Sequence, residues 1–191
     1  LSGREPVKIL DDKYITVTSF PLQHRVPSYG FLFREKKAER NIIKESIDKF
    51  RIPLVRIPAI KKGEDFITDN GIVIKNEDIT LSPSKPLSYA YCSDTKYFKR
   101  LASFVKEVNL LYHEATFDKT KDDLAKITGH STTIDAAKTA LDANAETLII
   151  GHFSARYKDI SLLVDEARSI FPATYPAIDG KSFDVGNVIH P

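Results

Sequence analysis

The residues of this chain best suited to chemistry are three histidines and an aspartate, namely His24, Asp94, His130 and His152. Each lies close to the predicted beginning or end of a strand or helix, where its side chain can face a cleft. Imidazoles and carboxylates are common zinc ligands. A pair of metal ions can hold a nucleophile at neutral pH and clamp a phosphoryl group. The set indicates an incomplete dinuclear metal site beside a proton-transfer group.

Strands alternating with helices are needed to position these side chains. Runs of β-branched and aromatic residues predict strands, and apolar residues at helical spacing predict helices. The predicted strands are Tyr14–Phe20, Tyr29–Arg34, Leu87–Cys92, Val108–His113 and Glu146–Ile150. The predicted helices are Arg40–Phe50, Tyr97–Val108, a helix capped by Ser131 or a neighbouring Thr that runs to about Ala143, and Asp159–Ile170. This pattern is typical of an α/β fold with a parallel or mixed sheet covered by helices. Functional groups in such sheets gather at strand ends, where Asp94, Glu114 and His152 are expected.

Each of these residues also has an ordinary structural use. Asp94, which precedes Thr95, would serve equally well as a helix cap. His24 and His130 would suit exposed loops, and His152 would suit a buried position bonded to backbone. The spacing does not match a compact zinc-binding signature.

Composition describes one globular domain with no membrane-spanning segment. The 191 residues include 42% hydrophobic and 28% charged residues, and the apolar runs are too short to cross a bilayer. The single cysteine, Cys92, excludes an internal disulfide and favours a reducing, cytoplasmic location. The chain has no methionine and begins with Leu1, which favours a piece of a longer protein.

Basic residues concentrate between Arg34 and Lys62. This segment has ten Lys and Arg residues against four Asp and Glu residues, a net charge of +6 in a chain of net charge +2. Pro53 and Pro58 predict that its second half is extended. A polyanion-binding arm over residues 34–63 is one interpretation, and a solvated, highly charged helix is the other.

Several segments, taken in order, resemble the ribonuclease Z family, the transfer RNA 3′-processing endonucleases of the metallo-β-lactamase superfamily. The segments are Phe20-Pro21-Leu22-Gln23-His24, Ser93-Asp94-Thr95, His113-Glu114-Ala115-Thr116-Phe117, Gly129-His130-Ser131-Thr132, His152-Phe153-Ser154-Ala155-Arg156-Tyr157 and Ser169-Ile170-Phe171-Pro172. The resemblance covers almost the whole chain.

The resemblance implies that residues 1–191 form a single partial domain, the C-terminal half of a metallo-β-lactamase-type αββα sandwich. The implied activity is zinc-dependent removal of 3′ trailers from precursor transfer RNA, in which a metal-bound hydroxide attacks the phosphodiester. The implied metal ligands are His24, Asp94 and His152, with Asp94 bridging two zinc ions. His130 would donate a proton and Glu114 would orient it. The expected substrate contacts are Ser131, Arg156, Lys44, Lys49, Arg51, Lys61 and Lys62.

Two departures from the family pattern affect the expected activity. The family's His-x-His-x-Asp-His motif is absent, so we expect it in a missing N-terminal half and expect the isolated chain to be inactive. The basic segment also lacks the family's Gly-Pro pair. The expected partners are precursor transfer RNA, the missing half and a second copy in a homodimer. The alternatives are another hydrolase of this fold that acts on small molecules, and a non-catalytic RNA-binding or dimerising half.

Overall fold

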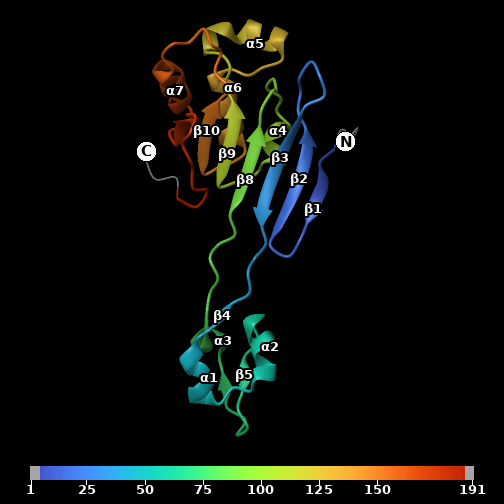
Figure 1. The fold of residues 1–191 in the computed structure, drawn as a ribbon, viewed down its shortest axis with the longest axis vertical. Helices are drawn as coiled ribbons and strands as arrows, with labels where there is room; N and C mark the ends of the chain where they lie inside the picture. Colours follow the sequence, from blue (N-terminus) through green and yellow to red (C-terminus); the bar gives the residue numbers. More distant parts are fainter. Residues whose placement is uncertain (1–4, 188–191) are drawn as a thin grey trace. The chain divides into compact units, whose positions relative to one another are not determined.

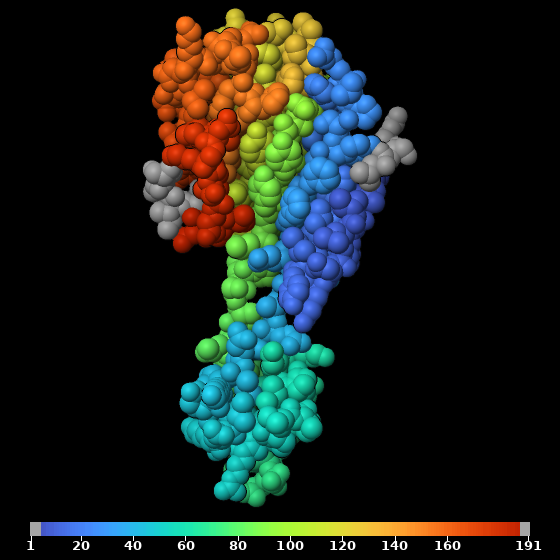
Figure 2. Space-filling model, viewed as in Figure 1, coloured from blue at the N-terminus to red at the C-terminus, as the bar shows by residue number. Residues whose placement is uncertain are grey.

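The structure is a computed structural model that describes residues 5–187. The chain groups into two compact units. The larger unit contains the residues up to Glu35 and those from Leu87 onward, and the smaller unit is Lys36–Pro86 (Figures 1 and 2). Within residues 5–187, no helix combines the length and the apolar character needed to cross a bilayer.

A seven-stranded mixed sheet forms the centre of the larger unit (Figure 1). Its order is β1 (Val7–Asp11), β2 (Ile15–Pro21), β3 (Tyr29–Glu35), β8 (Ser88–Cys92), β9 (Leu110–Glu114), β10 (Thr147–Gly151) and β11 (Thr174–Pro176). Strands β1, β2, β3 and β8 pair antiparallel, and β8, β9, β10 and β11 pair parallel. The predicted strands are therefore confirmed, including the hairpin pair β2 and β3.

Helices cover one face of this sheet. They are α4 (Leu101–Phe104), α6 (Thr133–Asp142) and α7 (Ser161–Arg168). Helix α5 (Asp122–Thr128), which follows the 3-10 turn η2 (Lys119–Lys121), lies beyond the strand ends (Figure 1). Alanines of α6 and α7, including Ala136 and Ala167, belong to the same buried cluster as Leu111, Leu148 and Ile150 of the strands. Small alanines bring these helices close to the sheet, and the large strand side chains fill the space.

The helix predicted over Tyr97–Val108 is wrong in length. Only Leu101–Phe104 is α-helical. Val105 leaves the helical conformation, and Glu107 has a positive φ of 57°. The apolar spacing of this segment instead places Leu101, Val105 and Val108 in the core as an irregular turn.

The start of α6 is fixed by a capping box. The hydroxyl of Thr132 accepts a hydrogen bond from the backbone N–H of Asp135 at 3.2 Å. The carboxylate of Asp135 accepts one from the N–H of Thr132 at 3.0 Å. A cap near Ser131 is confirmed, with Thr132 as the capping residue. This fixed helix start also fixes the loop that carries His130.

The opposite face of the sheet carries aromatic side chains in cross-strand rows. Tyr91 of β8 pairs with Phe31 of β3 on one side and with Tyr112 of β9 on the other. The rings of Tyr91 and Tyr112 stack with centroids 4.8 Å apart, and those of Phe33 and Tyr89 stack at 5.9 Å. These residues are half-buried, except for Tyr91, which is exposed.

The smaller unit has a core of its own. Its elements are β4 (Asn41–Ile42), α1 (Lys44–Phe50), the 3-10 turn η1 (Leu54–Arg56), α2 (Ile57–Lys61), β5 (Phe66–Ile67), β6 (Val73–Ile74), α3 (Asn76–Ile79) and β7 (Thr80–Leu81). Buried Ile52, Ile60, Phe66 and Ile79 form the core. The side-chain amide of Asn76 joins its segments by donating to the carbonyls of Ile60 and Glu64, each at 2.7 Å.

Two predictions for residues 40–61, in the smaller unit, are wrong. The predicted helix Arg40–Phe50 begins only at Lys44, because Asn41 and Ile42 pair with β7 instead. Residues Leu54–Lys61 are helical rather than extended. Pro58 lies in the first turn of α2, where the missing N–H of proline has no helical partner to lose.

Candidate active site

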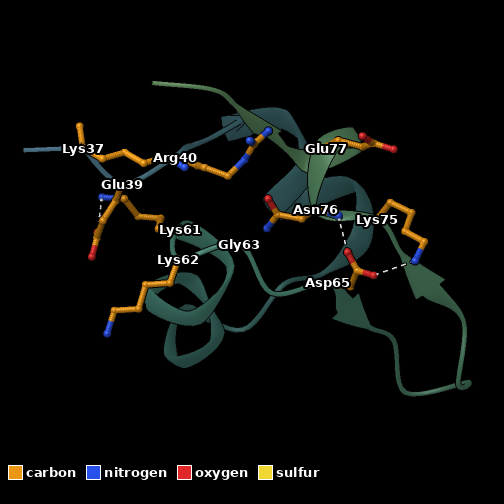
Figure 3. A pocket seen from close by; sticks show the side chains of 11 residues that line it. Lys37, Glu39, Arg40, Lys61, Lys62, Gly63, Asp65, Lys75, Asn76 and Glu77 are labelled. Carbon is orange, nitrogen blue, oxygen red and sulfur yellow. Dashed lines mark hydrogen bonds and ion pairs between the residues drawn. The ribbon is translucent and has the colours of Figure 1, made fainter. Parts of the chain in front are cut away.

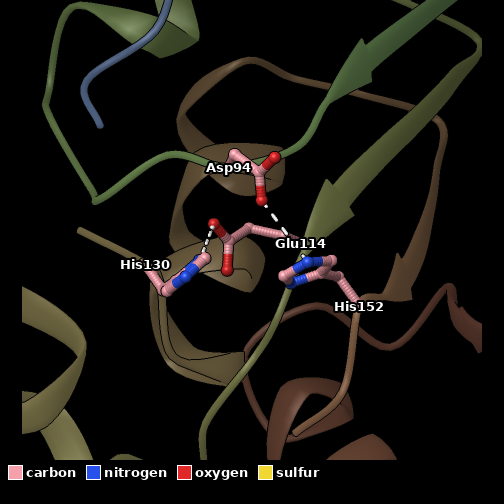
Figure 4. A group of neighbouring side chains, drawn as sticks. All are labelled: Asp94, Glu114, His130 and His152. Carbon is pink, nitrogen blue, oxygen red and sulfur yellow. Dashed lines mark hydrogen bonds and ion pairs between the residues drawn. The ribbon is translucent and has the colours of Figure 1, made fainter. Parts of the chain in front are cut away.

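Four side chains meet at the ends of the parallel strands (Figure 4). Asp94 follows β8, Glu114 is the last residue of β9, and His152 follows β10. His130 reaches the same place from the turn between α5 and α6. One possible ligand atom from each of the four lies within 4.8 Å of the others. Parallel strands end at the same edge of the sheet, so residues far apart in the sequence converge there.

Asp94 and His152 form the more exposed side of the site. The Nε2 atom of His152 lies 3.4 Å from Oδ1 of Asp94, and about half of each side chain is accessible, 43% and 48%. Both residues have positive φ angles, 57° for Asp94 and 60° for His152. Such a backbone conformation is uncommon outside glycine and is often found at functional sites. Here it turns both side chains toward each other directly after their strands.

Glu114 is fully buried and its carboxylate accepts four hydrogen bonds. Oε1 accepts from the N–H of Thr95 at 2.7 Å and from Nδ1 of His130 at 2.9 Å. Oε2 accepts from the hydroxyl of Thr116 at 2.5 Å and from the N–H of Ser131 at 3.2 Å. A carboxylate has about four lone-pair positions. All of them are used, so Glu114 is suited to holding its neighbours in place and has no free lone pair for a metal ion.

The imidazoles of His24, His130 and His152 form a row with His130 in the middle. The ring centroids are 4.9 Å apart between His24 and His130, and 5.2 Å apart between His130 and His152. Every Nδ1 has a partner, namely the carbonyl of Gly129 at 2.8 Å for His24, Glu114 for His130, and the hydroxyl of Thr116 at 2.9 Å for His152. Carbonyl and carboxylate oxygens only accept, so Nδ1 of His24 and of His130 must carry hydrogen. Their Nε2 atoms are then the ones available for chemistry.

The pair of Asp94 and His152 fits zinc. Two ligands placed about 2.0–2.1 Å from a tetrahedral ion are roughly 3.4 Å apart. The observed separation of 3.4 Å is too long for a hydrogen bond and matches this spacing. His24 is not part of the four-residue group, but its free Nε2 belongs to the same row of rings. Among the described residues, Asp94, Glu114, His130 and His152 thus form a group that could hold a metal ion.

Ser131 and Arg156 differ in their surroundings. The side chain of Ser131 is fully buried, and its hydroxyl donates to the carbonyl of Thr95 at 2.6 Å. Ser131 therefore holds the loops of the site together and has no exposed surface for a phosphate. Arg156 is exposed, donates from Nε to Ser154 at 2.9 Å and lies over the ring of Phe117.

The five basic residues expected to contact the substrate all belong to the smaller unit. Lys61 lies 3.6 Å from Glu39, and Lys49 lies over the ring of Phe50. Lys61 and Lys62 line a pocket of about 740 Å³ (Figure 3). The pocket also contains carboxylates, of which Asp65 bonds to Lys75 at 2.9 Å. Positive and negative groups are therefore mixed there.

Three residues of the site have supporting roles that the sequence does not reveal. Thr95 and Thr116 bond to Glu114, and His113 is fully buried on the other side of β9. Burial lowers the pKa of His113, so this ring is held neutral. Thr116 follows Glu114 by two residues in the segment His113–Phe117, which resembles a ribonuclease Z motif. This position is the only feature of the sequence that points to a role for Thr116.

Two curated proteins that are similar in sequence to this chain share one name, ribonuclease Z. No family model matches the chain. Ribonuclease Z from Bacteroides thetaiotaomicron is 44% identical over 184 residues, which are 96% of this chain and 58% of that protein. Ribonuclease Z from Cytophaga hutchinsonii is 41% identical over 182 residues, 95% of this chain and 58% of that protein. The chain therefore spans less than two thirds of the length of these relatives.

Solved structures support the fold. The short form of human tRNase Z superposes with a TM-score of 0.55 at 22% identity, covering 95% of this chain and 48% of that one. The metallo-β-lactamase fold protein YhfI from Bacillus subtilis gives a TM-score of 0.56 at 17% identity, covering 92% of this chain and 49% of that one. The fold is thus α/β and metallo-β-lactamase-like. At 41–44% identity over nearly all of its length, the chain is a homologue of ribonuclease Z that aligns with a little over half of each of these relatives.

Proposed function

We propose that this chain is part of a zinc-dependent endoribonuclease that removes 3′ trailers from precursor transfer RNA. The observation that carries the proposal is the row of three histidines beside Asp94, each ring held at Nδ1. This arrangement leaves ring nitrogens and a carboxylate facing a common space at the strand ends. The 41–44% identity to proteins named ribonuclease Z supports the choice of reaction.

In this proposal Asp94 and His152 hold metal together, with His24 as a further ligand. Zinc bound there would lower the pKa of a water molecule and neutralise charge on the scissile phosphate. The described residues supply too few ligands for two ions, so the remaining ligands come from outside this chain. We therefore expect the isolated chain to bind zinc weakly and not to cleave RNA.

His130 is the proposed proton donor to the departing ribose oxygen. Glu114 keeps a hydrogen on Nδ1, so Nε2 is the nitrogen that exchanges a proton with substrate. The buried carboxylate also stabilises the charged imidazolium, much as a carboxylate orients histidine in other hydrolases. Arg156, exposed beside Ser154, is the proposed phosphate contact.

We propose that the smaller unit contacts RNA through exposed Lys44, Lys49, Arg51 and Lys62, with Lys61 already near Glu39. The unit as a whole is less basic than its first part, because residues 36–86 contain eleven basic and eight acidic residues, a net charge of +3. Replacing the five basic residues should weaken precursor binding and its dependence on salt, since each phosphate contact releases counterions. Hydrolysis of a small phosphodiester should change little.

A chimera tests the proposed reaction. This chain would replace the aligned 184 residues of the Bacteroides thetaiotaomicron relative. The chimera should cleave precursor transfer RNA and bind zinc. Asp94→Asn should remove cleavage and lower zinc content, and His130→Ala should reduce cleavage while zinc content stays nearly constant. Asp142→Asn, on the exposed side of α6, is the matched control and should behave like the parent.

Three outcomes would contradict the proposal. A folded chimera that binds zinc but cleaves only small substrates would favour a different hydrolase of this fold. RNA binding without zinc or cleavage would favour a non-catalytic role. Tight binding of two zinc ions by the isolated chain, with turnover, would show that the ligand set is complete without further residues.

A further inference from the structure

Thr116 lies between the buried pair of Glu114 and His130 and the more exposed pair of Asp94 and His152. Its hydroxyl oxygen is 2.5 Å from Oε2 of Glu114 and 2.9 Å from Nδ1 of His152. The residue is 6% exposed and follows the end of β9 by two positions. This single oxygen therefore connects the buried carboxylate, which also holds His130, to the exposed imidazole that faces Asp94.

The direction of each hydrogen bond follows from counting hydrogens. Glu114 also accepts from the backbone N–H groups of Thr95 and Ser131, and a backbone N–H cannot act as an acceptor. Its carboxylate is thus surrounded by donors, as an ionised group requires. The one hydrogen of the Thr116 hydroxyl must then point to Oε2. The contact with His152 can form only if Nδ1 of His152 carries the hydrogen.

The opposite arrangement leaves an unfavourable contact. If Nδ1 of His152 had no hydrogen, Thr116 would donate to it. The oxygens of Thr116 and Glu114 would then face each other at 2.5 Å with no hydrogen between them. An unpaired buried acceptor costs about 1–3 kcal/mol. Neutral histidine in water places its hydrogen on either nitrogen, so a preference of this size is enough to select one tautomer.

We propose that Thr116 is a positioning residue that fixes His152 as the Nδ1-protonated tautomer and directs the Nε2 lone pair toward Asp94. Nε2 lies 3.4 Å from Oδ1 of Asp94, where a divalent cation would be shared by both. Glu114 thereby sets the tautomer of two histidines, of His130 directly and of His152 through Thr116. Groups of this kind behind a metal ligand raise its affinity for the metal.

The tautomer can be measured without metal or activity. The chain is labelled with 15N-histidine, and imidazole nitrogen shifts are recorded at pH 8, with His152→Gln used for assignment. We expect a hydrogen on Nδ1 of His152 in the parent and in Thr116→Ser, which keeps the hydroxyl. Thr116→Val has nearly the same shape and no hydroxyl, so His152 should shift to a mixture rich in the Nε2-protonated form. Thr139→Val, another buried threonine, is the control and should leave the signals unchanged.

Zinc titration of the same variants connects the tautomer to the proposed function, on which only this second part rests. Loss of such a supporting hydrogen bond lowers metal affinity by about 10- to 100-fold. We expect that loss for Thr116→Val and a change of less than about threefold for Thr116→Ser.

A parent spectrum with the hydrogen on Nε2 of His152, or a Thr116→Val spectrum equal to the parent, would overturn the proposal. A changed tautomer with unchanged zinc affinity would leave the role of Thr116 intact and count against the metal site. If Thr116→Val does not fold, the parent and Thr116→Ser spectra still decide the tautomer.

Discussion

Replacement of Glu114 by glutamine tests whether four donors depend on one buried carboxylate. Glutamine has the same shape, but its amide offers one accepting oxygen and one NH₂ group that only donates. If the NH₂ replaces Oε1, it faces the N–H of Thr95, and if it replaces Oε2, it faces the N–H of Ser131. Either orientation leaves one buried backbone N–H without an acceptor.

The expected cost follows from these contacts. An unsatisfied buried donor costs about 1–3 kcal/mol, and each remaining bond weakens by about 1 kcal/mol when its charged acceptor becomes neutral. Two bonds remain on the accepting oxygen, so we expect Glu114→Gln to lower the free energy of unfolding by about 3–5 kcal/mol. The control is Glu107→Gln, whose carboxylate is 61% exposed and 3.3 Å from Lys106. It should change stability by less than about 0.5 kcal/mol.

Urea denaturation followed by tyrosine fluorescence is a suitable assay. All eight tyrosines lie outside residues 36–86 and the chain has no tryptophan, so the signal reports the larger unit alone. Equal m-values in both variants would show that the unfolding reaction itself is unchanged. A loss below about 1 kcal/mol in Glu114→Gln, similar to that in Glu107→Gln, would refute the assignment of four hydrogen bonds to this carboxylate.

Three further predictions concern the residues around the site. Gly129→Ala should destabilise the larger unit by about 2 kcal/mol, because alanine disfavours its φ of +82° and the new Cβ would lie 2.9 Å from Nδ1 of His24. Gly180→Ala has nearly the same φ, +81°, with open space around it, so thermal unfolding should show the smaller loss of about 1 kcal/mol there. Thr132→Ala should cost about 1–2 kcal/mol through loss of the capping box, and Thr132→Ser should restore most of it in urea titrations. His113→Asn should reduce the loss of stability between pH 7.5 and 5.5. Burial lowers the pKa of His113 in the folded chain, so the unfolded chain binds the proton first as the pH falls below about 6.5. This difference costs the parent up to about 1.4 kcal/mol of stability per pH unit, and the variant lacks it. Equal pH dependence of parent and variant would contradict a buried neutral His113.

The sequence predicted five of the seven strands of the larger unit's sheet, for a physical reason, and missed the exposed strand β1 and the three-residue strand β11. Strands such as Leu148–Ile150 are runs of large apolar residues, and their burial determines the structure. Strand ends in turn determine which polar residues meet, so Asp94, Glu114 and His152 could be grouped in advance. The contact between His130 and Glu114 was expected, and the structure places the two groups 2.9 Å apart.

Other features depend on contacts between distant residues that no local pattern encodes. The compactness of residues 36–86 depends on Asn76, whose amide reaches the carbonyls of Ile60 and Glu64. The burial of Ser131 depends on the carbonyl of Thr95, 36 residues earlier. The role proposed for Thr116 depends on its contacts with both Glu114 and His152, and the sequence does not show that these two residues meet at Thr116.

One aromatic row on the opposite face of the sheet ends next to the site. Tyr112 precedes Glu114 by two residues, and a Cβ at position 151 would lie 2.6 Å from its hydroxyl, which requires glycine immediately before His152. Burial raises the pKa of Tyr112 to about 12, so this hydroxyl remains uncharged over the whole physiological range. A side chain at position 151 would therefore displace either Tyr112 or the backbone that carries His152.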